Sequence, residues 1–371
     1  MIKYLGSKRR LVQAISSLAS GCGASTAADL FTGTTRVAQE LKRQGVNVTA
    51  VDTATYSEVL AQCYVGLDAT TVVGAEASQA IAELGALPGQ KGYFTEVFCE
   101  RSRYLRPENG ARVDAIRDAI EVRHRGSWLY PVALTSLLEA ADRVDSTTGL
   151  QMAYLKQWAP RSYRPLELRV PELLAGPGRA IRADAREALA SLGPVDFAYL
   201  DPPYNQHRYF TNYHVWETLI RWDAPDHYGV ACKRSDSRSA ATRSDFNSKA
   251  TMPVALAEVV EAIDATVVVV SCNDESWLSR EDLVRMCAAR GHVELLEFDS
   301  KRYVGAQIGI HDPAGQKVGR VSHLRNVERL AVCGPRGNVL AAIEGWRRRS
   351  LEALEAGPLA AGSTGLGPVR L

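Results

Sequence analysis

Short apolar runs and amphipathic stretches alternate at the start of the chain. Residues 27–31 have the composition of a strand end, residues 32–35 form a glycine-containing turn, and residues 36–44 carry apolar positions at helical spacing. A second predicted strand, residues 46–51, leads to Asp52, roughly 20 residues beyond the turn. This order opens a nucleotide-type βαβ unit, in which such an acid binds ribose hydroxyls, but the repeated glycines of an NAD fingerprint are missing.

The pattern changes between residues 66 and 165. Helical stretches are broken there by polar and glycine-containing turns, and no buried strand stands out. We expect an inserted, mainly helical domain. Its second boundary is loosely defined because four prolines punctuate the return to the sheet, namely Pro160, Pro165, Pro171 and Pro177.

Strand and helix alternate again in the second half, which predicts an α/β domain made of residues 1–65 and 166–335. A polar turn between extended arms is expected at residues 305–318, a C-terminal helix at 336–356, and a disordered tail at 357–371 because it is rich in Gly, Pro, Ser and Ala. The remaining predicted strands are residues 180–184, 195–200, 266–271, 293–298 and 330–333, with helices at 185–192 and 280–290.

Composition narrows the class of protein. The chain has 371 residues, of which 46% are hydrophobic and 23% charged, and no apolar run approaches the ~18 to 20 residues of a membrane span. The basic start has no following apolar segment, so we expect no secretory signal. Seven cysteines without a Cys-x-x-Cys pair predict neither a disulfide framework nor a metal site, which favours a cytoplasmic protein.

The net charge is only +2, so contact with nucleic acid would have to come from local patches. Residues 101–125 hold seven arginines, and residues 233–249 hold five basic residues. Either segment, taken alone, could equally be a solvated helix or loop face.

The tetrapeptide Asp201-Pro202-Pro203-Tyr204 follows a short apolar run, so it lies where a sheet passes into a loop. Ligands of open α/β sheets bind at that edge. The two prolines fix the backbone and make a stiff platform of acceptors between a carboxylate and an aromatic ring, which suits a flat group bearing an NH2. The alternative is a strand end closed by a Pro-Pro turn, with Tyr204 as ordinary packing.

Four motifs occur in an order that resembles the Dam-like (alpha-group) DNA adenine-N6 methyltransferases. They are Lys3-Tyr4-Leu5-Gly6-Ser7-Lys8, Asp29-Leu30-Phe31-Thr32-Gly33-Thr34, Val51-Asp52 and Asp201-Pro202-Pro203-Tyr204. The continuation Asn205-Gln206-His207-Arg208-Tyr209, Asn212-Tyr213-His214 and Trp216-Glu217-Thr218 is similar to a restriction-modification branch of that family. Weak motifs in the correct order form a strong joint signal.

The resemblance implies a Rossmann-like, S-adenosylmethionine-dependent catalytic domain split by a target-recognition insertion at residues 66–165. The product would be S-adenosylhomocysteine. The implied cofactor residues are Tyr4, Lys8, Phe31, Gly33, Asp52, Asp184 and Asp201, although Asp184 could equally be a helix cap. The family's turn usually reads Phe-x-Gly-x-Gly, and Thr35 stands at the place of the last glycine.

The implied chemistry requires positioning and no metal. Adenine's exocyclic amine is a poor nucleophile, and Asp201 with the Pro202 carbonyl can accept its two hydrogen bonds, next to Pro203. Stacking on Tyr204 would hold the base outside the helix.

Cations interleaved with aromatic residues are expected to contact double-stranded DNA. The loop at residues 233–249 could order over DNA on binding. A helix face packed on its neighbour is the alternative for Tyr154 and Trp158. The expected DNA-binding residues are Arg103, Arg106, Lys156, Arg161, Arg208 and Lys233.

The interpretation is therefore a bacterial or phage adenine-specific DNA methyltransferase, cytoplasmic and nucleoid-associated, with a cognate restriction endonuclease as a possible partner encoded nearby. Rivals are an RNA adenine or DNA cytosine-N4 methyltransferase and a catalytically silent DNA-binding module. Asp rather than Ser before Pro-Pro-Tyr favours adenine.

Overall fold

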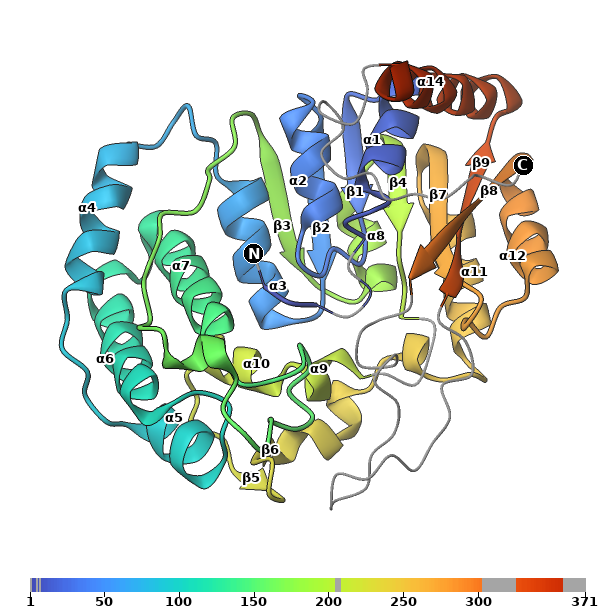
Figure 1. Ribbon diagram of the computed structural model, residues 1–371. Helices are drawn as coiled ribbons and strands as arrows, with labels where there is room; N and C mark the ends of the chain where they lie inside the picture. Colours follow the sequence, from blue (N-terminus) through green and yellow to red (C-terminus); the bar gives the residue numbers. More distant parts are fainter. Residues whose placement is uncertain (1, 5, 7, 204–207, 302–324, 356–371) are drawn as a thin grey trace.

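A seven-stranded sheet forms the centre of the protein (Figure 1). The computed structural model describes residues 2–4, 6, 8–203, 208–301 and 325–355. The strand order is β3-β2-β1-β4-β7-β9-β8, with neighbours parallel from β3 to β7 and β9 antiparallel to both β7 and β8. The strands are β1 Thr26–Asp29, β2 Asn47–Asp52, β3 Gly178–Arg182, β4 Val195–Leu200, β7 Ala265–Asn273, β8 His292–Lys301 and β9 Arg325–Gly334. The predicted α/β, Rossmann-like fold class is confirmed.

Register brings the ends of three parallel strands together. Asp29, the last residue of β1, pairs with Ala50 on β2 and with Tyr199 on β4. Asp52 ends β2, and Asp201 directly follows β4. The carboxyl ends of parallel strands share one edge of a sheet, so the three aspartates lie side by side at that edge.

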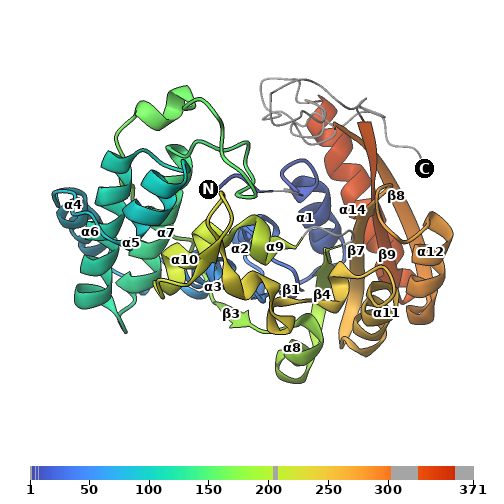
Figure 2. The ribbon, with the colours of Figure 1, turned by 90° about the horizontal axis from the view of Figure 1, so that it is seen from below.

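Helices cover both faces of the sheet, as Figure 2 shows from below. One face carries α1 Val12–Gly21, α2 Arg36–Arg43 and α14 Arg336–Glu355, and the other carries α8 Ala185–Leu192, α11 Met252–Ala262 and α12 Arg280–Cys287. With both faces covered, the central strands can be apolar throughout, which explains the valine run of β7. The α3 helix, Thr55–Ala61, packs on β2 and β3 and continues into a π-helical turn, Gln62–Gly66.

Residues 66–165 contain helices and no strand. They form α4 Gly74–Gly85, α5 Tyr93–Thr95 with the π-helical turn Glu96–Arg101, α6 Pro107–His124, α7 Leu129–Arg143 and the 3-10 turn Pro160–Tyr163. Phe94, Val113 and Leu134 from this part belong to the same apolar core as Ile15 and Val48 from the sheet domain. That these residues recognise the DNA target remains a prediction.

The segment after β4 folds beside these helices. It contains α9 Tyr209–Asn212, α10 His214–Arg221, a two-stranded sheet of β5 His227–Tyr228 and β6 Lys233–Arg234, and 3-10 turns at Ser235–Arg238, Ala240–Thr242 and Asp245–Asn247. The basic loop, residues 233–249, therefore already has regular turns without DNA.

The predicted bounds of most strands lie within two residues of those in the structure. Strand β9 is longer than predicted, because its first half is polar and was not recognised as a strand. The expected helix at residues 280–290 ends at Cys287 and gives way to a 3-10 turn, Ala288–Arg290. The expected turn at residues 305–318 and the tail at 357–371 lie outside the described residues. Within the described part of the chain, no helix is long and apolar enough to span a membrane, and no cluster of His, Cys, Asp or Glu could hold a metal ion.

Candidate active site

Asp201 stands at the carboxyl end of β4 and forms an ion pair with Lys8 from the N-terminal segment. The Lys8 Nζ lies 3.1 Å from Asp201 Oδ1 and 3.4 Å from Oε2 of Glu328, which β9 supplies. Pro202 is buried and Pro203 half-buried. Tyr204 falls outside the described residues. The structure thus brings together two residues that the sequence predicted and a third, Glu328, that it did not.

The ionisation of Asp201 is finely balanced. Burial raises the pKa of its carboxyl group to about 6, against the lowering effect of Lys8, and the Glu328 carboxylate raises that pKa further. A carboxyl group that titrates near the physiological range, at the edge where ligands bind, is typical of a functional site.

Gly33 and Asp52 together shape the turn after β1. The Asp52 carboxylate accepts the Gly33 amide at 2.9 Å with Oδ2 and the Ala54 amide at 3.0 Å with Oδ1. Gly33 has φ of +52°, and a Cβ added there would lie 2.9 Å from the Tyr4 ring. A side chain would therefore push Tyr4 off the turn, so glycine is required for this close approach.

Thr35 adopts the backbone conformation of the glycine that it replaces. Its φ of 61° and ψ of 15° are left-handed, which is unusual for a β-branched residue. The buried Thr35 hydroxyl donates to the Thr34 carbonyl at 2.7 Å and accepts from the Gln39 amide at 2.8 Å. Thr35 thus holds a left-handed backbone conformation that glycine adopts more readily.

Asp29 is a site residue that the sequence analysis quoted within a motif but did not single out. It is buried, its Oδ2 accepts the Thr32 hydroxyl at 2.9 Å, and its Oδ1 has no hydrogen-bond partner among the described residues. Burial raises the pKa of Asp29 to about 7, with smaller contributions from the Asp201 and Asp52 charges. Its place at a strand end, three residues before the turn, was the signal that could have found it.

Aromatic rings cover the other side of the turn. Tyr4 stacks on Tyr213 with ring centres 4.8 Å apart and on Tyr209 at 5.2 Å. Phe31 packs edge-to-face on the buried Phe246 at 4.9 Å. The motif near the N-terminus is therefore fixed to α9 and α10, the helices that follow the Asp201 loop.

Asp184 caps a helix. Its carboxylate accepts the Arg186 backbone amide at 3.0 Å at the start of α8, and it also pairs with the Arg186 side chain. The cap that the sequence left as an alternative is present, and a contact with cofactor stays a prediction.

The predicted DNA-binding residues are placed in different surroundings. The Arg103 guanidinium lies 4.6 Å from the Trp158 ring and donates to the Lys156 carbonyl at 2.6 Å. Arg106 lies 4.6 Å from the exposed Tyr163 ring and pairs with Glu108. The other predicted contacts are Arg161, ion-paired with Asp145 at 2.7 Å, exposed Arg208, exposed Lys156 and half-buried Lys233.

Two arginines inside the basic runs are structural. Arg117 is buried and donates to the backbone carbonyls of Leu219 and Ile220 at the end of α10. Arg234 is buried between Asp223 and Asp236, each at 2.7 Å. The two runs are therefore less available to DNA than their sequence suggests, because tertiary partners already neutralise part of their charge.

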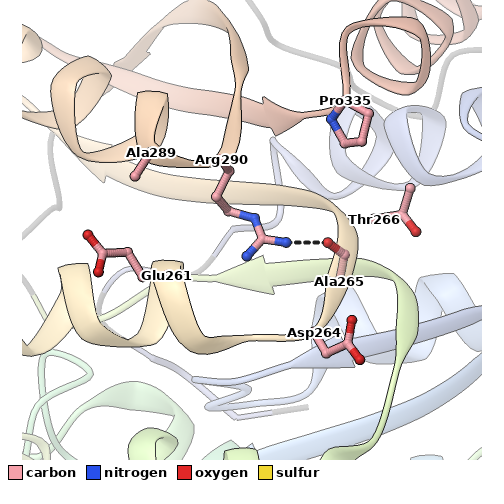
Figure 3. Close-up of a pocket in the computed structure, with 7 residues that line it drawn as sticks. All are labelled: Glu261, Asp264, Ala265, Thr266, Ala289, Arg290 and Pro335. Carbon is pink, nitrogen blue, oxygen red and sulfur yellow. Dashed lines mark hydrogen bonds between the residues drawn. The ribbon is translucent and has the colours of Figure 1, made fainter.

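A shallow cavity of about 560 Å³ lies at the opposite edge of the sheet (Figure 3). It is lined by Ala265 and Thr266, where β7 begins, and by Arg290, whose guanidinium donates to the carbonyls of Val260, Ile263 and Ala265. Since β7 is parallel to β4, this cavity is at the far end of the strands from Asp201. Arg290 therefore joins α11 to β7 by hydrogen bonds.

A doubly wound sheet with one reversed strand and acids at three adjacent carboxyl ends is a Rossmann-like fold with a ligand-binding edge. Residues 4–286 match the family model described as D12 class N6 adenine-specific DNA methyltransferase, and the chain belongs to this family. The predicted resemblance is confirmed.

The chain is also similar to named methyltransferases. The chain is 27% identical over 317 residues to the type II methyltransferase M.NlaIII of Neisseria lactamica. The aligned region covers 81% of this chain and 92% of the relative. The chain is 28% identical to the modification methylase StsI of Streptococcus sanguinis and 27% identical to LlaI of Lactococcus lactis subsp. lactis, again over 81% of this chain. The matched region spans about half of these two longer relatives, 49% and 51%.

Proposed function

We propose that this chain transfers a methyl group from S-adenosylmethionine to the exocyclic N6 amine of an adenine flipped out of double-stranded DNA. The observation that carries the proposal is the meeting of Asp29, Asp52 and Asp201 at one edge of the sheet. Burial raises the pKa of each carboxyl group. Cations or hydrogen-bond donors stabilise the ionised form of such groups, and a ligand at this edge can supply them.

The donor and acceptor set at this edge fits S-adenosylmethionine. The Asp29 oxygen that lacks a hydrogen-bond partner among the described residues suits an ammonium group such as that of the methionine part. Asp52 uses one lone pair on each oxygen for a backbone amide, which leaves acceptor capacity for ribose hydroxyls. The glycine turn under Tyr4 allows close approach of a ligand, Phe31 precedes this turn in the chain, and Lys8 lies beside Asp201. When bound, the cofactor supplies a methyl group on a positively charged sulfur.

Asp201 and the Pro202 carbonyl would hold the adenine amine. Two accepted hydrogen bonds favour a tetrahedral nitrogen whose lone pair points toward the methyl carbon. The amine forms the new N–C bond with that lone pair, the electrons of the C–S bond remain on sulfur, and one amine proton passes to solvent. Placement in line contributes several kcal/mol, with ~7 to 11 as an upper range.

DNA would approach the same edge of the sheet. The cation–aromatic pairs Arg103 with Trp158 and Arg106 with Tyr163 offer charge for phosphates and faces for bases. Arg208, Lys156, Lys233 and Arg161 are further candidates for phosphate contacts, Arg161 only if its pair with Asp145 opens.

The relatives' names, type II methyltransferase and modification methylase, support a role in restriction-modification. We infer that the chain protects a site in host DNA from a cognate endonuclease encoded nearby. Family membership favours DNA adenine over RNA adenine and cytosine-N4 as substrate.

The test uses the full chain with tritiated S-adenosylmethionine and genomic DNA from a methylation-deficient host. We expect label in double-stranded DNA, recovered as N6-methyladenine after digestion to nucleosides. Label in N4-methylcytosine, or in an RNA control and not in DNA, would replace the proposed substrate. DNA binding without incorporation would identify a silent DNA-binding module. Single-molecule sequencing of DNA from an expressing host would then give the target sequence.

A further inference from the structure

Lys8 lies between two carboxylates from different parts of the fold. The Lys8 side chain is 7% exposed, that of Asp201 16% and that of Glu328 17%, so the three charges are largely removed from water. Glu328 lies beyond residue 286, where the match to the family ends, and it reaches the site because β9 pairs with β7. Nothing in the sequence motifs predicted this third charge.

The proposed chemistry creates a competition for Asp201. A carboxylate that is engaged by Lys8 at 3.1 Å is a poorer acceptor for the substrate amine, because the ammonium draws its electrons. If Asp201 turned from Lys8 to the amine, the buried Lys8 ammonium would lose one of its two carboxylate neighbours, which is unfavourable. Glu328, 3.4 Å from the same Nζ, is placed to remain as a counter-charge.

We propose that Glu328 is a positioning residue for methyl transfer, which holds Lys8 while Asp201 turns its carboxylate to the substrate amine. The inference rests on the proposed adenine-N6 methylation. The two carboxylates and one lysine also give the cluster a net charge of −1 when all are ionised, which complements the positive sulfur of the methyl donor.

The neighbours of Asp201 determine what its pH profile should show. Lys8 lowers and Glu328 raises the pKa of Asp201, so removal of the Glu328 charge lowers it. Among the described residues, the other titratable groups that interact with Asp201 include Asp29 from β1, Tyr199 from β4 and Cys272 from β7. Burial raises the pKa of both Tyr199 and Cys272, which leaves Asp29 as the other group titrating near neutrality.

The decisive variant is Glu328→Gln in the full chain, assayed with labelled S-adenosylmethionine and unmethylated genomic DNA. Lys8 then has Asp201 as its remaining partner of the two, so we expect kcat to fall ~10²-fold while KM for both substrates changes less than ~3-fold. The acidic limb of the rate profile should move to lower pH. A role in folding alone would leave that limb in place.

Glu297→Gln is the matched control. Glu297 on β8 pairs with Arg329 of β9 at 3.0 Å, so this variant breaks an ion pair in the same strand pair without touching the Asp201 cluster. We expect its kcat and pH profile to match those of the wild type. Equal losses in both variants would show that the hairpin and not Glu328 is responsible.

Glu328→Asp keeps the negative charge on a side chain that is one methylene shorter. It therefore separates the effect of the charge from an effect on folding. We expect an intermediate kcat and an acidic limb close to that of the wild type, and this variant carries the test if Glu328→Gln does not fold. Wild-type kcat and an unmoved limb in Glu328→Gln, or equal rates in the Asp and Gln variants, would overturn the inference. An inactive wild type would overturn the proposed function instead.

Discussion

The two ends of β4 carry aspartates in opposite states. Asp196, at the start of the strand, accepts the backbone amides and hydroxyls of Ser25 and Thr26 at 2.8 to 2.9 Å, and these bonds lower the pKa of its carboxyl group to about 2. Asp201, just past the other end, is half-buried beside Lys8, which it shares with Glu328, and its pKa is raised to about 6. The Asp196 carboxylate therefore accepts four hydrogen bonds from the protein, whereas the Asp201 carboxylate has a lysine partner that also contacts Glu328.

The difference between Asp196 and Asp201 suggests that the amino edge of the sheet supports the fold and the carboxyl edge supports ligand binding. At the amino edge, Arg290 and Asp196 join elements by hydrogen bonds within the protein. At the carboxyl edge, Asp29 keeps an oxygen without a partner in the described part of the chain, and Thr35 holds a left-handed backbone. A ligand bound at the carboxyl edge could supply a hydrogen-bond donor for that Asp29 oxygen.

The largest effect is expected for Asp201→Ala. Loss of the carboxylate removes the acceptor for the substrate amine, so methylation should fall by ~10³-fold or more while the chain stays folded. Incorporation of labelled methyl groups measures the rate, and thermal unfolding checks the fold. Activity within tenfold of the wild type would contradict the role given to Asp201.

Asp52→Ala should weaken cofactor binding by roughly 1 to 3 kcal/mol, because a charged hydrogen bond to ribose is lost. Calorimetric titration with S-adenosylhomocysteine gives the affinity. An unchanged Kd would remove Asp52 from the cofactor site. The Gly33 amide also loses its acceptor, so a comparison with Asp52→Asn separates the two contributions.

The methylation rate should depend on pH through Asp201. Its carboxylate must be ionised to accept from the amine, and its raised pKa of about 6 places the acidic limb there, with a loss of ~10-fold per pH unit below it. A pH profile of kcat with the wild type measures this limb. A rate that stays level down to pH 5 would show that ionised Asp201 is not required.

Asp196→Ala should lower stability and spare activity. The free energy of unfolding at pH 7 should fall by about 1 kcal/mol, a figure reduced for the partial exposure of this carboxylate. Because the folded pKa is depressed, the contribution is present above the unfolded pKa of ~4 and is lost as pH falls toward about 2. Urea unfolding at several pH values tests this, and a loss of methylation would contradict the separation of the two edges.

Local pattern predicted the sheet and part of the site. Apolar runs ending in Asp52 and in Asp201-Pro202 located two strand ends, because a short run of consecutive apolar residues is enough to indicate a buried strand and its length. Glu328 could not be predicted, because it reaches Lys8 through the pairing of β9 with β7. Buried Arg117 and Arg234 appeared as surface charge for the same reason: their partners are distant in sequence or visible only in the fold.

On the prediction that residues 66–165 recognise the DNA target, the apolar core that joins them to the sheet limits how this protein can acquire a new target sequence. Because Phe94, Val113 and Leu134 pack in one cluster with Ile15 and Val48, exchanging the helical part as a block would cut through the core. Changes confined to exposed side chains, such as Tyr163, leave the interior intact. Engineering of specificity in this chain should therefore proceed by surface substitution and not by grafting of whole segments.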